Sequence, residues 1–117
     1  MALATELSVY KSTYDLTLKT FSIVKNFSRE YKYTLGESMK SELLKVSVLV
    51  YRANVSRNNR SMILAEAREH IEALRLLFRL AHDTKTISLG SFVELAESIE
   101  AISKQLAAWQ KSSEKYS

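Results

Sequence analysis

Apolar side chains recur at intervals of three and four residues through four long segments of this 117-residue chain. That spacing places them on one face of an α-helix, because each residue advances the helix by about 100°. Proline is absent and only two glycines occur, so residues that break helices or build the turns of β-rich folds are scarce. The pattern predicts an all-α protein.

The apolar segments predict four helices, over about residues 5–27, 34–55, 61–83 and 88–112. The predicted inner face of the first helix consists of Leu7, Tyr10, Tyr14, Leu18, Phe21 and Val24. The inner faces predicted for the other three consist of Met39, Leu43, Val46 and Val50, then Leu64, Ala67, Ile71, Leu74, Phe78 and Ala81, then Phe92, Leu95, Ile99, Ile102, Leu106 and Trp109. Thr34 and Glu37 match a capping box, and Ser61 and Ser88 are the expected N-caps of the last two helices.

The segments between these helices are short, roughly three to eight residues, which makes consecutive helices antiparallel neighbours. No internal repeat or low-complexity linker divides the chain. The expected architecture is therefore an up-down-up-down antiparallel four-helix bundle, with residues 1–117 forming a single domain.

Two sets of apolar residues lie outside the predicted inner faces: Leu44, Val48, Tyr51 and Val55 on the second helix, and Leu76, Leu77 and Leu80 on the third. Of the second set, Leu76 and Leu80 are the candidate interface residues. The set on the second helix recurs at helical steps and is turned about 100° from the inner face. Exposed apolar patches of this extent usually mark interfaces, which predicts a homo-oligomer. The alternative is that these two helices are simply the more central ones in the bundle.

The sequence has no set of residues with the pattern of a catalytic or metal site. His70 and His82 are twelve residues apart on one helix and so about 120° apart around it, and neither follows a glutamate by three residues. Glu94, Glu97 and Glu100 are spaced as on a solvated helix face. No phosphate loop, dinucleotide fingerprint or serine-nucleophile motif occurs. We therefore expect a protein that is not an enzyme and that carries no cofactor or metal.

The N-terminal sequence MALATELSVYK lacks a charged leader followed by an apolar signal core, and no apolar run reaches the ~18 residues of a membrane span. Cysteine is absent, which fits a reducing compartment. A cytoplasmic protein with no membrane contact is the expectation.

Basic residues concentrate in the first half of the chain. The net charge is +4, while residues 25–60 hold eight basic and three acidic residues and so carry +5. The candidate nucleic-acid or partner-binding residues are Lys25, Arg29, Lys32, Arg52, Arg57, Arg60, Arg68, Arg75 and Arg79. The alternative is ordinary surface pairing, since Glu72 can pair with Arg68 and Arg75. Likewise Tyr31 and Tyr33 could stack on bases or pack on the bundle end.

Four segments, in this order and spacing, resemble a known family. They are FSREYKYTLGESMK at the turn between the first two helices, VYRAN at the end of the second, LRLLFRLAHDTKTIS from the third helix into the fourth, and QLAAWQKS near the end. The chain is similar in these to the accessory variability determinants, the small four-helix-bundle partners of reverse transcriptases in diversity-generating retroelements. Its wider relatives are the bundle proteins encoded in intervening sequences of ribosomal RNA.

This resemblance implies a homopentamer that binds DNA and RNA without strong sequence preference and binds a reverse transcriptase during mutagenic retrohoming. The family's basic Leu-Arg-x-x-x-Arg pattern on the third helix falls on Arg75 and Arg79. Two other interpretations stay open: a protein-binding adaptor bundle without nucleic-acid function, and a bundle protein of the ribosomal-RNA type.

Overall fold

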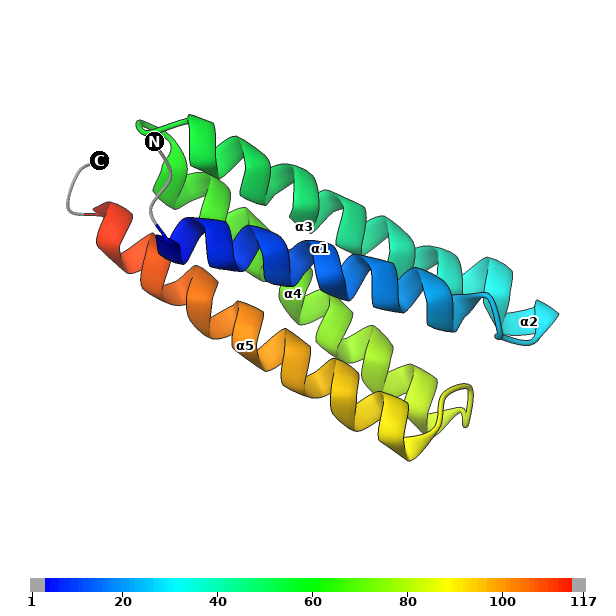
Figure 1. The fold of residues 1–117 in the computed structure, drawn as a ribbon. Helices are drawn as coiled ribbons and strands as arrows, with labels where there is room; N and C mark the ends of the chain where they lie inside the picture. The colour runs from blue at the N-terminus through cyan, green and yellow to red at the C-terminus, as the bar shows by residue number, and fades with distance from the viewer. Residues whose placement is uncertain (1–3, 115–117) are drawn as a thin grey trace.

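The computed structural model describes the backbone of residues 4–114 and the side chains of residues 8–114. Its four long helices are α1 (Ala4–Val24), α3 (Glu37–Val55), α4 (Arg60–Asp83) and α5 (Leu89–Ser113). A short helix, α2 (Arg29–Tyr31), and a π-helical turn, η1 (Lys32–Gly36), connect α1 to α3. Figure 1 shows the four long helices alternating in direction, which confirms the predicted four-helix bundle.

The bundle is a rod of 46 × 22 × 20 Å. Each helix packs on two others, α3 lying against α1 and α4, and α5 lying against α4 and α1. The α1–α3 connection and the loop 84–88 lie at one end of the rod, and the loop 56–59 lies at the other (Figure 1). Residues of these two ends therefore cannot form one patch within a subunit.

The core confirms the inner faces predicted for α3, α4 and α5. Every predicted inner residue of these helices is buried, except Phe92, which is partly buried and packs against the core. Burying a leucine or isoleucine side chain stabilises the fold by about 1.5–3 kcal/mol, so these three stripes supply most of the driving force for folding.

The inner face predicted for α1 was wrong in its rotation about the helix axis. Of the α1 side chains that the structure describes, the buried ones are Val9, Thr13, Leu16, Thr20 and Val24. The prediction was therefore correct for Val24, and Leu7 lies outside the described side chains. Tyr10, Tyr14 and Leu18 are instead 45%, 57% and 55% exposed. Because two residues of the buried stripe are threonines, the spacing of apolar residues does not reveal it. Thr13 is compatible with the core because its Oγ1 donates a hydrogen bond to the carbonyl oxygen of Val9 at 2.8 Å.

The capping box predicted at Thr34 was also wrong. Helical backbone begins right after Ser28, which has an extended ψ of 156°, and Thr34 lies inside η1 with its Oγ1 donating to the carbonyl oxygen of Glu30 at 2.9 Å. The segment coils early because Phe27 and Leu35 are both buried against the end of the bundle. A Cβ on Gly36 would lie only 2.6 Å from Cγ1 of Val24, so the glycine permits this close packing on α1.

The other two predicted caps had opposite outcomes. Ser88 is a true N-cap, since its Oγ accepts a hydrogen bond from the backbone N–H of Ser91 at 3.1 Å. Ser61 is not, because α4 begins one residue before it and Asn59 holds the cap position, its carbonyl oxygen accepting from the N–H of Ile63 at 2.9 Å.

Candidate nucleic-acid and partner interface

Among the candidate arginines of α4, Arg75 meets carboxylates of both α4 and α5. Arg75 Nη1 donates to Oε2 of Glu100 at 2.8 Å, and its Nε lies 3.3 Å from Oε1 of Glu72. These contacts raise the pKa of Arg75, mainly through the hydrogen bond to Glu100, and the same bond lowers the pKa of Glu100. The positive charge of Arg75 is thus compensated within the subunit.

The two neighbouring arginines are also engaged. Arg79 Nε lies 3.4 Å from Oδ2 of Asp83, although 70% of the Arg79 side chain remains exposed. Arg68 Nη1 donates to the amide oxygen of Gln110 at 2.8 Å, and Arg68 has no ion-pair partner within residues 8–114. The expected pairing of Glu72 therefore holds for Arg75, while Arg68 bonds to α5 instead.

Three basic residues at the α1–α3 connection, Lys25, Arg29 and Lys32, are here called the turn cations. Across residues 8–114 none of the three has an ion-pairing carboxylate, and Glu30 is the single acid of the segment. Beside them, Tyr33 is 63% exposed, whereas Tyr31 packs partly against the core. This end of the rod therefore combines unpaired positive charge with one exposed aromatic ring.

The basic residues at the opposite end differ in role. Arg60 Nε donates to the carbonyl oxygen of Ala53 at 2.7 Å and Nη2 to that of Asn54 at 3.1 Å, which satisfies carbonyls at the end of α3. Its guanidinium also lies 5.6 Å from the centre of the Trp109 ring. Arg60 thus ties three helices together, while Arg57 is exposed on the loop.

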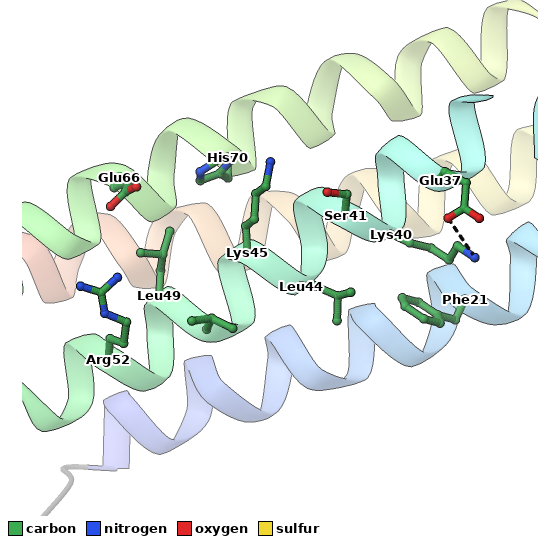
Figure 2. A pocket seen from close by; sticks show the side chains of 11 residues that line it. Phe21, Glu37, Lys40, Ser41, Leu44, Lys45, Leu49, Arg52, Glu66 and His70 are labelled. Carbon is green, nitrogen blue, oxygen red and sulfur yellow. Dashed lines mark ion pairs between the residues drawn. The ribbon is translucent and has the colours of Figure 1, made fainter. Parts of the chain in front are cut away.

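A shallow depression of about 820 Å³ runs across the outer side of α3. Figure 2 shows its walls: Phe21 comes from α1, Glu66 and His70 come from α4, and the rest come from α3. Lys45 and Arg52 line it, and neither has an ion-pair partner among the described residues. The depression is therefore partly apolar and partly cationic.

The predicted interface residues of α3 are all exposed, and the structure adds α1 residues to them. The resulting surface, here called the α1–α3 apolar face, consists of Tyr10, Tyr14, Leu18, Leu44, Val48, Tyr51 and Val55, each 45–67% exposed. Phe21, one turn beyond Leu18 on α1, lines the same depression as Leu44 and Val48, so the two stripes adjoin. Thr17 and Ser47, with hydroxyls 3.4 Å apart, lie along the seam beneath them.

Two of the three additional apolar residues of α4, Leu76 and Leu80, point away from the bundle. Leu76 is 69% and Leu80 is 47% exposed, and Met62, also on this outer side, is 70% exposed. Leu77 packs against the core instead. The sequence identified the two leucines but not Met62, whose helical position relative to Leu76 was the available signal.

The structure reveals no further chemical centre in the part of the chain that it describes. Within that part, no three His, Cys, Asp or Glu side chains converge as metal ligands would. His70 instead pairs with Glu42 across α3 and α4, and the His82 ring stacks on Phe92 with centroids 4.5 Å apart. No described helix is long and apolar enough to cross a membrane.

Comparisons with known proteins show the family of this chain. The bundle is similar to the crystal structure of a protein of unknown function from the S23 ribosomal protein family of Bacteroides thetaiotaomicron VPI-5482, with a TM-score of 0.83, 14% sequence identity, and coverage of 92% of this chain and 98% of that one. At this identity the likeness shows the fold alone. No functionally curated protein matches the sequence. The model of the bAvd-like family matches residues 7–113, and the chain therefore belongs to the bAvd-like family of accessory variability determinants.

Proposed function

We propose that this protein is an accessory factor of a diversity-generating retroelement that binds the reverse transcriptase together with template RNA and DNA. The observation that carries the proposal is the family match over residues 7–113. The unpaired turn cations support it, because phosphate contacts supply most of the affinity of proteins that bind nucleic acid without sequence preference.

Within this proposal the turn cations are the principal phosphate contacts. Lys25, Arg29 and Lys32 meet a phosphate without giving up a carboxylate, whereas Arg75 would have to leave Glu72 and Glu100. Arg75 and Arg79, which the family resemblance indicated, then contribute less to nucleic-acid affinity. Arg52, Arg57 and Arg68 have no ion-pair partner among the described residues and are secondary candidates.

A fluorescence-anisotropy titration with labelled single-stranded RNA and DNA at two salt concentrations tests this assignment. The triple change of Lys25, Arg29 and Lys32 to Ala should weaken binding and make the slope of log K against log salt shallower by about 2, because three phosphate contacts are lost. The matched control, Arg75→Ala with Arg79→Ala, should change the slope less.

Two results would contradict the assignment. Wild type that fails to bind nucleic acid at low salt would remove the nucleic-acid part of the function. A larger loss of affinity in the Arg75 and Arg79 double variant than in the triple variant would mean that the main phosphate contacts lie on α4.

Partner binding and self-association belong to the same proposal. The α1–α3 apolar face supports both, since exposed apolar surface of this extent is usually covered by protein. Affinity purification of the protein with the reverse transcriptase of its own retroelement, followed by mass measurement of the free protein, tests the two parts separately. A homopentamer is the expected free form.

The second candidate is a protein-binding adaptor, and the breadth of the α1–α3 apolar face is the observation that favours it. The net charge of +4 is also modest for a protein whose main ligand is a polyanion. A reverse-transcriptase gene and a template repeat beside the encoding gene would support the accessory function, and their absence would favour the adaptor.

A further inference from the structure

We infer that Lys85, in the loop 84–88 between α4 and α5, binds a nucleic-acid phosphate together with the turn cations. Lys85 is not one of the basic residues that the sequence pattern singled out, and no comparison assigns it a role. The inference rests on the proposed nucleic-acid binding and adds a contact to it from a second connection of the bundle.

The loop ends α4 in a Schellman motif. The backbone N–H of Lys85 donates to the carbonyl oxygen of His82 at 3.0 Å, and the N–H of Thr86 donates to that of Ala81 at 2.8 Å. This pattern of bonds requires a left-handed backbone at the residue after the cap, Thr84. That residue is Lys85, whose φ is 60°.

This position is an unfavourable one for a lysine. Glycine usually occupies it, because a left-handed backbone brings a Cβ too close to the following carbonyl oxygen. Within the part of the chain that the structure describes, Lys85 is the only residue other than glycine with a positive φ. Such strained residues concentrate at functional sites. The lysine at this position therefore indicates a use for its side chain outside the fold.

The side chain of Lys85 is available to a ligand. It is exposed, and it has no ion-pair partner among residues 8–114. Asp83, the nearest acid along the chain, lies 3.4 Å from Nε of Arg79. The loop itself is anchored, since Ile87 is buried. The structure thus holds an unpaired cation on a fixed backbone, which lowers the entropy lost on binding.

The loop 84–88 and the α1–α3 connection share one end of the rod (Figure 1). Residues 25–36 and 84–88 together hold four basic residues, Lys85 and the three turn cations, and one acid, Glu30, and so carry +3. The rod is 22 × 20 Å across. About six nucleotides span this width, at about 3.4 Å each along one strand of a duplex. A strand that crosses this end can therefore contact Lys85 and the turn cations together.

The neighbours of Lys85 favour a phosphate over an acidic protein as its ligand. Thr84 and Thr86 flank it, and threonine hydroxyls commonly donate to phosphate oxygens. The one apolar residue of the loop 84–88, Ile87, is buried. The loop itself therefore offers a protein partner no apolar surface for the core of an interface.

The test is a fluorescence-anisotropy titration of the full chain with labelled RNA and DNA at several salt concentrations. Lys85→Asn removes the charge and keeps a residue that tolerates the left-handed backbone. It should bind a few-fold more weakly at low salt. The slope of log K against log salt should be shallower by about 0.7 for single strands and about 0.9 for duplex, because one phosphate contact is lost. Lys85→Arg should bind like wild type.

The matched control is Lys111→Asn, which removes the same charge at the opposite end of the rod (Figure 1). Lys111 is exposed near the end of α5 and has no ion-pair partner among the described residues. Its variant should keep the wild-type affinity and slope.

A thermal melt tests the argument from the backbone independently. Lys85→Gly relieves the left-handed strain and should raise the melting temperature by about 4 °C. In the titration the same variant should lose as much affinity as Lys85→Asn. A gain in stability together with a loss of affinity is not expected of a lysine that serves the fold.

Four results would overturn the inference. Wild type that binds nucleic acid, with Lys85→Asn equal to it in affinity and slope, would exclude Lys85 and leave the proposed function intact. Wild type that fails to bind at low salt would remove the proposed nucleic-acid function and this contact with it. An equal loss in Lys111→Asn would mean that net charge acts rather than position. A lower melting temperature of Lys85→Gly would mean that the lysine stabilises the loop.

Discussion

The turn cations and the arginines of α4 look alike as sequence but differ in the folded bundle. Both are clusters of basic residues beside aromatic or apolar neighbours. Helix α5 brings Glu100 to Arg75, whereas within residues 8–114 no acid forms an ion pair with Lys25, Arg29 or Lys32. The comparison teaches that the charge available to a ligand depends on the facing helix rather than on the count of basic residues.

The largest expected effect concerns the exposed aromatic ring beside the turn cations. Tyr33→Ala should weaken binding of single-stranded nucleic acid by about 1–3 kcal/mol, the usual contribution of one stacked base. Duplex binding should change little, because its bases are already stacked. Tyr33→Phe keeps the ring and is the control in the same anisotropy titration. Equal losses on single strands and duplex would exclude stacking.

A change at Gly36 tests whether close packing of the α1–α3 connection, which holds the turn cations, stabilises the fold. Gly36→Ala should lower the free energy of unfolding by about 1–3 kcal/mol, because its Cβ would lie 2.6 Å from the buried side chain of Val24. Chemical denaturation measures this. Gly90→Ala is the matched control, since the nearest atom to its added Cβ is Ser88 Oγ at 4.0 Å. Equal stability of the two variants would show that Val24 gives way freely.

Removing the two acids that pair with Arg75 should make this arginine as available to nucleic acid as the turn cations are. Glu72→Gln with Glu100→Gln removes its two carboxylates and should raise nucleic-acid affinity a few-fold at low salt. Asp15→Asn with Glu97→Gln makes the same change in net charge without releasing an arginine. A similar gain in both variants would mean that affinity depends on net charge alone, and that the ion pairs of Arg75 do not keep it from binding phosphate.

The smallest expected effect is on the pH dependence of stability. Arg75 lowers the pKa of Glu100 below its usual value of 4.5, so the pair stabilises the fold above that pH and stops doing so as pH falls through the lowered pKa. Thermal melts of wild type and Glu100→Gln should therefore differ slightly at neutral pH and converge in acid. A difference that persists in acid would assign it to packing.

Most of the fold was predictable because helical spacing of apolar residues reports directly on burial. The cores of α3, α4 and α5 and the cap at Ser88 follow from that spacing and from local hydrogen bonding. The rotation of α1 was not predictable from apolar residues, since Thr13 and Thr20 occupy core positions while Tyr10 and Tyr14 are exposed. Apolar residues at helical spacing mark both a core and an exposed face, and only packing distinguishes them.

The features of the candidate site also divide into those that the sequence determines and those that depend on tertiary structure. The sequence by itself determined which residues carry charge, that α3 has a second apolar stripe, and that the family match spans residues 7–113. Tertiary structure decided which cations are compensated, that Arg60 holds the end of α3, and that stripes of α1 and α3 adjoin. The physical reason is range: periodicity and caps act within about one helical turn, whereas Arg75 meets a carboxylate 25 residues away along the chain.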